Sequence, residues 1–185
     1  MTAGRTNSKQ RSKHWCTPPK YIEAIELFFS GIIDLDPCSN EYSLVNSRIR
    51  YALPERDGLH ESWNYKNIFV NPPYGADTIR KTTIKHWIYK CEEANRIYNS
   101  EVLALVPVAT NTRHWKDYIF GKASCICFLY DTRLKFYIDG MSDDKGAPMS
   151  CAMVYWGINI KKFIHIFSKY GAALDISSAK GKLFG

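Results

Sequence analysis

The stretch Asn67-Ile68-Phe69-Val70-Asn71-Pro72-Pro73-Tyr74 decides the fold class predicted for this chain. Its first four residues form a short apolar, β-favouring run that is typical of a buried strand. Two consecutive prolines cannot continue a strand ladder, so the strand must end in a rigid loop, which Asn71 enters with an extended backbone. Ligands of open α/β sheets bind at the carboxyl ends of the strands. The stretch therefore predicts an α/β fold with a site at this loop.

The loop Asn71 to Tyr74 has the groups needed to activate an exocyclic amine of a nucleobase. Such an amine is a poor nucleophile, because its lone pair is delocalised into the ring. The side-chain oxygen of Asn71 and the carbonyl of Pro72 can accept hydrogen bonds from its two N–H groups, and Tyr74 can stack on the base. With Pro73, which stiffens the loop, these are the candidate catalytic residues, acting by orientation and electrostatics. The alternative interpretation is a proline-rich turn that ends a core strand.

Composition predicts a single soluble globular domain. The chain has 185 residues, of which 45% are apolar and 23% charged, and no apolar run has the length of a membrane span. The polar N-terminus lacks the apolar segment of a signal peptide, which predicts a cytoplasmic protein. The six cysteines show no paired CxxC spacing, so we expect reduced thiols and no metal site.

Charge is concentrated at the N-terminus. Residues 1–20 contain five basic residues and no acid, while the whole chain has a net charge of +7. We interpret residues 1–14 as a flexible basic arm and residues 15–185 as one domain. Arg11 and Lys13 in the arm are candidates for phosphate contacts. A solubilising tail is the alternative.

Further elements follow from apolar patterning and turn residues. Thr17 is predicted to be the N-cap of a first helix, with Pro18 at its first position. Later segments are expected to form strands at 32–36, 101–108, 124–130 and 149–156, helices at 77–99 and 161–169, and a short helix after Thr112. Residues 131–148 are expected to form an exposed loop or hairpin that mixes basic and aromatic side chains, suited to nucleic-acid contact or simply to solvent.

Six short motifs occur in an order that resembles the phage-type DNA N6-adenine methyltransferase family. The Asn-Pro-Pro-Tyr motif alone is shared with other amino-methyltransferases, but the combination is more specific and covers roughly residues 15–156. The motifs are Thr17-Pro18-Pro19, Asp36-Pro37-Cys38-Ser39, Asp57-Gly58-Leu59, Asn71-Pro72-Pro73-Tyr74, Val106-Pro107 and Arg133-Leu134-Lys135-Phe136.

The resemblance implies a Rossmann-like methyltransferase, with a mostly parallel sheet, helices on both faces and an antiparallel final strand. It implies S-adenosylmethionine as cofactor and N6 of adenine in double-stranded DNA as acceptor. It also implies a cytoplasmic protein of a bacterial host cell, and a phage or prophage is compatible with it as the source. A base inside a duplex cannot reach such a pocket, so we expect base flipping, with Tyr74 receiving the base.

The resemblance also assigns roles to individual residues. Asp36 would pair with the cofactor's ammonium group and Asp57 would hydrogen-bond its adenine. The other cofactor candidates are Thr17, Pro18, Asp34, Pro37, Cys38 and Asn71. The candidates for contact with nucleic acid are Arg11, Lys13, Tyr74, Arg113, Arg133 and Lys135.

One departure from the family pattern leaves alternatives open. The usual glycines after Asp36 are missing, and Asn40-Glu41-Tyr42-Ser43 stand in their place. This departure is the support for a non-catalytic nucleic-acid-binding module of the same fold. Because the Asn-Pro-Pro-Tyr motif also serves other acceptors, methylation of RNA or of a protein glutamine amide is the second alternative.

Overall fold

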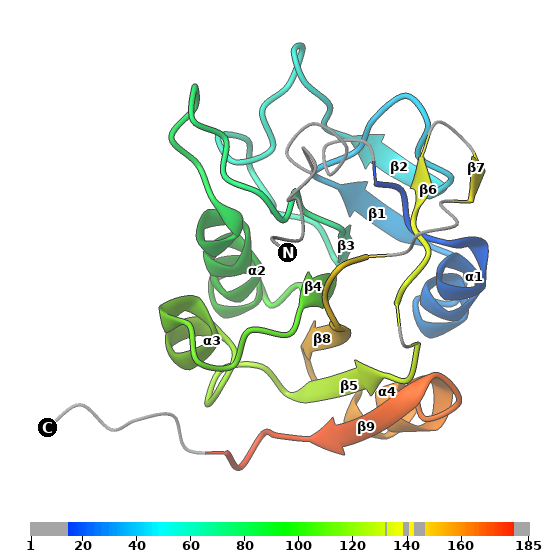
Figure 1. Cartoon of the computed structure of the whole chain (residues 1–185). Helices are drawn as coiled ribbons and strands as arrows, with labels where there is room; N and C mark the ends of the chain where they lie inside the picture. Colours follow the sequence, from blue (N-terminus) through cyan, green and yellow to red (C-terminus); the bar gives the residue numbers. More distant parts are fainter. Residues whose placement is uncertain (1–14, 132, 139–140, 143–146, 180–185) are drawn as a thin grey trace, which may run out of the picture.

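The computed structural model describes residues 15–131, 133–138, 141–142 and 147–179, and shows an α/β fold (Figure 1). The predicted basic arm, with Arg11 and Lys13, lies outside the described residues. The helices are α1 (Pro19–Phe28), α2 (Ile84–Tyr98), α3 (Arg113–Tyr118) and α4 (Ile160–Phe167). The strands are β1 (Ile33–Asp36), β2 (Ser47–Arg50), β3 (Asn67–Val70), β4 (Glu101–Pro107), β5 (Cys125–Leu129), β6 (Tyr137–Ile138), β7 (Met141–Ser142), β8 (Cys151–Trp156) and β9 (Gly171–Asp175).

Seven of these strands form one mixed sheet, in the order β2-β1-β3-β4-β8-β5-β9. The strands β2, β1, β3 and β4 pair in parallel. The strand β8 is antiparallel to both β4 and β5, so β5 runs in the same direction as β4. The predicted α/β sheet is thus confirmed, but two strands rather than one run against the others, and the antiparallel β8 is inserted within the sheet.

The second antiparallel strand, β9, was not predicted. Its sequence, Gly-Ala-Ala-Leu-Asp, contains no β-branched or aromatic residue, so its strand propensity is low. It pairs only with β5, at the edge of the sheet. A Cβ atom at Gly171 would lie 2.1 Å from the carbonyl oxygen of Phe128, so tertiary pairing and a close backbone approach define this strand.

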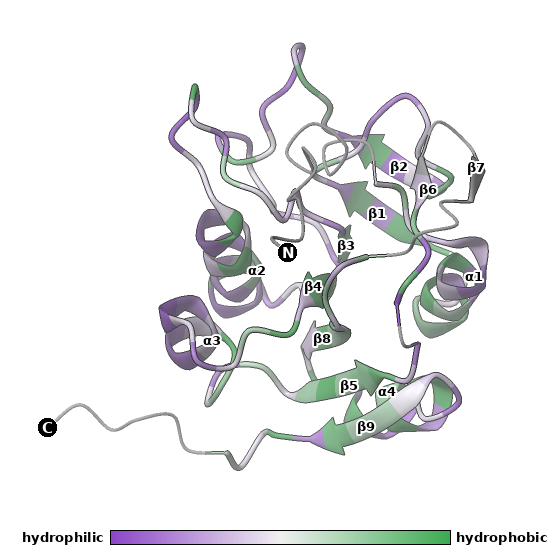
Figure 2. Ribbon diagram, viewed as in Figure 1, coloured by the Kyte–Doolittle hydropathy of each residue, from purple (hydrophilic) through white to green (hydrophobic). Residues whose placement is uncertain are grey.

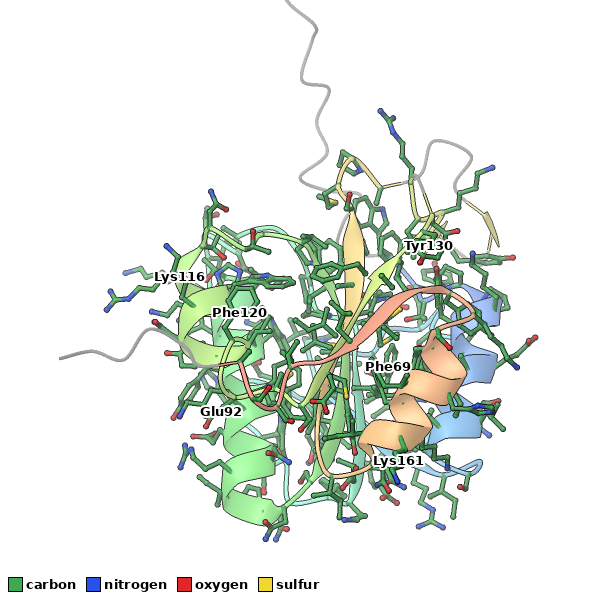
Figure 3. The ribbon with its side chains drawn as sticks, turned by 90° about the horizontal axis from the view of Figure 1, so that it is seen from below. Phe69, Glu92, Lys116, Phe120, Tyr130 and Lys161 are labelled. Atoms are coloured by element: carbon green, nitrogen blue, oxygen red, sulfur yellow. The ribbon has the colours of Figure 1, made fainter. Side chains whose placement is uncertain are left out.

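Side chains alternate between two buried clusters, one on each face of the sheet. Phe69 belongs to the cluster that includes α1 and α4, whereas Ile68 and Val70 belong to the cluster that includes α2 and α3. Figure 3 shows this layering, with Phe69 inside and α2 and α4 on opposite sides. Burial on both faces explains why the central strands are apolar throughout (Figure 2).

Two predicted helix starts are wrong. The N-cap of α1 is Pro18, not Thr17, and α1 begins at Pro19 without a side-chain cap; the Thr17 hydroxyl instead accepts a hydrogen bond from Asn71. The helix predicted from residue 77 begins at Ile84. Residues 75–83 form a loop, in which Lys81 has a left-handed backbone with φ 53°. A helix cannot pass through such a residue.

The carboxyl ends of β1, β3 and β4 meet at one edge of the sheet, because these strands are parallel. The loop after β1 is joined to the end of β2 by two backbone hydrogen bonds. Tyr51 N–H donates to Asp36 at 3.0 Å, and Ser39 N–H donates to Tyr51 at 3.0 Å. The predicted motifs therefore lie along a single edge. Among the described residues, none of the helices has the length and apolar character needed to cross a membrane.

Candidate active site

The carboxamide of Asn71 is held in one orientation immediately after β3. Its Nδ2 donates to the carbonyl oxygen of Trp15 at 3.1 Å and to Oγ1 of Thr17 at 3.2 Å. A backbone carbonyl can only accept, so the amide must present its NH2 group to Trp15 and turn Oδ1 away. No described residue donates a hydrogen bond to this oxygen, which remains available to accept one from a ligand.

Tyr74 is half-buried and fixed by its hydroxyl. That group donates to the carbonyl oxygen of Leu105 on β4 at 3.1 Å and contacts the thiol of Cys151 at 3.9 Å. Burial raises the pKa of Tyr74 well above its usual range, so the phenol stays neutral. The loop that follows β3 is thus attached to the neighbouring strand through the tip of this side chain.

Trp15 and Phe136 complete an aromatic cluster around Tyr74. Their rings stack on each other, with centroids 4.9 Å apart and planes 4° apart. Both lie nearly perpendicular to the Tyr74 ring, at centroid distances of 5.9 and 5.7 Å. Among the described residues no parallel ring covers Tyr74. The described ring neighbours of Tyr74 thus meet it edge to face.

The segment that contains Phe136 is attached to the chain just before α1. Cys16 N–H donates to Tyr137 at 2.8 Å, and Tyr137 N–H donates to Cys16 at 3.0 Å. Phe136 is buried, while Arg133 and Lys135 on the same segment are exposed. Sequence reasoning did not assign Trp15 or Phe136 to the site; their positions next to Thr17-Pro18 and at the end of the Arg-Leu-x-Phe element were the available indications.

A cavity of about 330 Å³ opens between the loops that follow β1, β2 and β3. This volume is within the range of small-molecule sites, about 300–1,000 Å³. The sequence predicted Pro37, Cys38, Asp57 and Pro73 as site residues, and all of them line the cavity. Its wall also includes residues that no motif indicated, namely Tyr51, Leu53, Arg56, Arg80, Thr83 and Trp87.

The close contact between Gly58 and Pro37 explains why a glycine follows Asp57. A Cβ atom at position 58 would lie 1.8 Å from the carbonyl oxygen of Pro37. The Gly58 carbonyl in turn accepts a hydrogen bond from the indole of Trp63 at 2.7 Å. Two walls of the cavity therefore touch backbone to backbone, at a distance that only glycine permits.

Asp36 is a buried carboxylate just behind the cavity wall. It is 4% exposed and accepts hydrogen bonds from Cys38 N–H at 3.2 Å and from the Ser43 hydroxyl at 3.4 Å. Burial raises the pKa of Asp36 to about 6, although these donors and the charge of Arg50 oppose the shift. Within the described part of the chain no basic side chain forms an ion pair with it. A buried acid of this kind is a candidate binding site for a cation.

The two other candidate acids differ in position. Asp57 lines the cavity, and its carboxylate holds Arg80 in a bidentate pair, with Nε to Oδ2 at 3.1 Å. Asp34 does not line the cavity. It accepts a hydrogen bond from Asn67 N–H at 3.0 Å, at the start of β3, and pairs with Arg48 at 3.1 Å.

The remaining candidates lie around the cavity without lining it. Thr17 is buried, at 2% exposed, against Asn71, and Pro18 precedes α1. Arg113 is the first residue of α3; its side chain is 82% exposed and lies 3.3 Å from Asp117. The structure thus brings Thr17, Asn71 and Tyr74 together and places the cavity beside them.

Comparison with known proteins gives one match. The model of a family described as DNA N-6-adenine-methyltransferase (Dam) matches residues 4–180. No curated protein and no solved structure matches the chain significantly.

Proposed function

This chain belongs to the DNA N-6-adenine-methyltransferase (Dam) family, and we propose that it transfers a methyl group from S-adenosylmethionine to N6 of adenines flipped out of double-stranded DNA. The family match confirms the resemblance predicted from the order of the motifs. It supports methylation of adenine N6 in DNA, and a mixed α/β sheet is compatible with a methyltransferase fold. The observation that carries the proposal is the orientation of the Asn71 amide. Its Oδ1 faces away from Trp15 and accepts no hydrogen bond from a described residue, and Pro73 of the same loop lines a cavity of ligand size.

Asn71 and Pro72 act on the target amine. Asn71 Oδ1 and the Pro72 carbonyl accept hydrogen bonds from its two N–H groups and favour a pyramidal nitrogen, whose lone pair is less delocalised into the ring and can attack the methyl group. Positive charge develops on this nitrogen as the new bond forms, so both acceptors bind the transition state more tightly than the ground state. The proton leaves from a cationic product, and no base has to act before the attack.

Tyr74 receives the flipped base. Its hydroxyl is anchored to Leu105, and the two rings that contact it in the described part of the chain, Trp15 and Phe136, are perpendicular to it. Stacking on this ring would place the edge of the adenine, with its amine, toward Asn71. Flipping is required because the target atom is inaccessible inside a duplex.

The cavity fits the cofactor by the chemistry of its walls. Bound S-adenosylmethionine supplies an electrophilic methyl group on a positively charged sulfur. The buried Asp36 would pair with its ammonium group, behind the wall formed by Pro37 and Cys38. Asp57 would accept a hydrogen bond from the cofactor's adenine, sharing its carboxylate with Arg80. Thr17 and Pro18 belong to the Asn71 side of the site, whereas Asp34 faces the start of β3.

The DNA would lie over the same edge of the sheet. Arg113, Arg133 and Lys135 are exposed there and would contact phosphates, which bind without reading sequence. Arg11 and Lys13 are proposed for the same role. Affinity for DNA should therefore decrease steeply as salt increases.

The test is transfer of a labelled methyl group from S-adenosylmethionine to unmodified DNA, RNA or protein, followed by digestion of the acceptor. The expected product is N6-methyladenine in DNA alone. Label in RNA or in glutamine would identify the alternative acceptors. The absence of both methyl transfer and cofactor binding would support a non-catalytic module.

A further inference from the structure

The loop of residues 75–83 presents an isoleucine to solvent next to the proposed active site. It begins directly after Tyr74 and ends at the start of α2 (Figure 1). Asp77, Arg80, Thr82 and Thr83 line the cavity, but Ile79 does not. The side chain of Ile79 is 89% exposed, the highest value for a large apolar residue in the described part of the chain. One side of the loop thus lines the cavity, while the side chain of Ile79 is exposed to solvent.

This loop is held in shape by hydrogen bonds. Asp77 and Thr82 exchange two backbone hydrogen bonds, of 2.9 and 3.1 Å. The Asp77 carboxylate also accepts from the N–H groups of Ile79 and Arg80, both at 3.0 Å. Arg80 is anchored across the cavity to Asp57. Because the turn around Ile79 is already formed, the loop loses little further conformational entropy when Ile79 contacts a partner.

Two lysines follow the exposed isoleucine closely in the chain. Lys81 lies two residues later in the same loop and is exposed, and Lys85 lies in the first turn of α2. Burial, and then the charge of Lys85, lower the pKa of His114, which places Lys85 beside the start of α3. The nearby acids are engaged, Asp77 with backbone amides and Asp57 with Arg80. Figure 2 shows the hydrophobic tip of this loop between hydrophilic segments.

This loop carries an apolar side chain, is followed by lysines and begins directly after Tyr74. An apolar side chain suits exposed base faces, and lysines suit phosphates. We propose that Ile79 inserts between base pairs and occupies the space that the target adenine leaves when it flips out. Architectural proteins use isoleucine, leucine and phenylalanine as such wedges. The lysines would contact the flanking phosphates, while the side chain covers the exposed base faces. This role rests on the proposed function and adds a residue that stabilises the flipped state.

The test compares Ile79→Ala with wild type on duplex and heat-denatured DNA, measured as labelled N6-methyladenine. Ile79→Ala should reduce kcat/KM on duplex DNA by about tenfold or more. The shorter side chain no longer fills the vacated space, so it no longer offsets the free-energy cost of unstacking the bases. On denatured DNA, which has no vacated space to fill, it should stay within about twofold of wild type. Ile79→Leu should restore most of the activity on duplex DNA.

Ile158→Ala is the matched control. Ile158 is 84% exposed, but it lies at the opposite end of β4, where its N–H contacts Glu101; its variant should match wild type on both substrates. Equal activity of Ile79→Ala and wild type on duplex DNA would overturn the inference, as would an equal loss on both substrates. If wild type methylates only duplex DNA, the second comparison uses a duplex whose target adenine faces an abasic site, on which the deficit should shrink. A wild-type protein that methylates no DNA would instead refute the proposed function.

Discussion

Replacing Thr17 by valine tests whether this residue positions Asn71 or contacts the cofactor. Valine has nearly the same shape, so the buried position, at 2% exposed, is filled without a cavity. The substitution removes the acceptor that lies 3.2 Å from Asn71 Nδ2. One proton of the amide then lacks a partner, and only the Trp15 carbonyl still favours the productive orientation.

The expected effect follows from the loss of one hydrogen bond, about 1 to 1.5 kcal/mol. This corresponds to a decrease in kcat of about 5- to 12-fold. Affinity for S-adenosylmethionine, measured by calorimetry, should stay within about twofold of wild type, because the cavity walls are unchanged. Thr17→Ser retains the hydroxyl and should recover most of the wild-type kcat.

Two results would refute this reasoning. An unchanged kcat for Thr17→Val would mean that the Trp15 carbonyl alone orients the amide. Weaker cofactor binding with an unchanged kcat would assign Thr17 to the cofactor, as the family resemblance implies. A thermal unfolding curve for each variant shows whether the fold is intact.

Two other predictions concern the cofactor cavity. The pKa of Asp36 is raised to about 6, so its carboxylate becomes protonated as the pH falls through that value. Affinity for S-adenosylmethionine in calorimetry should therefore decrease from pH 7.5 to pH 5, and Asp36→Asn should bind weakly with little pH dependence; the same affinity at both pH values in wild type would exclude the pairing. Gly58→Ala places a Cβ atom 1.8 Å from the Pro37 carbonyl oxygen, so the two walls must separate. Overpacking of about 1–3 kcal/mol predicts an affinity loss of roughly 5- to 150-fold, and unchanged affinity would show that the walls shift without affecting the cavity.

Local sequence was sufficient for the apolar central strands and for the loop that follows β3. The apolar run before Asn71 ends at two prolines, which act through covalent geometry that tertiary contacts cannot override. Strand β3 accordingly ends where it was predicted to end. Asp57 and Gly58, which the order of the motifs indicated, line the cavity, and the structure supplies the reason for the glycine.

Long-range contacts account for what the sequence did not predict. The hydroxyl of Thr17 has two uses, to cap a helix or to hold Asn71, and only the folded chain shows the second. Phe136 reaches the site because its neighbour Tyr137 pairs through the backbone with Cys16, more than a hundred residues earlier in the chain. Asp34 and Asp36 are alike in sequence, but Asp34 accepts a hydrogen bond from Asn67 at the start of β3, whereas Asp36 ends β1 and accepts one from Ser43.

The most direct test of the central claim is single-turnover methyl transfer to DNA by wild type and by Asn71→Ala at saturating S-adenosylmethionine, with the product analysed as nucleosides. The account predicts N6-methyldeoxyadenosine as the labelled product of wild type. It also predicts a decrease of about 100- to 1,000-fold for Asn71→Ala, as expected when an electrostatic contact in the transition state is lost, with cofactor affinity largely retained. A rate for Asn71→Ala close to that of wild type would contradict the assigned chemistry.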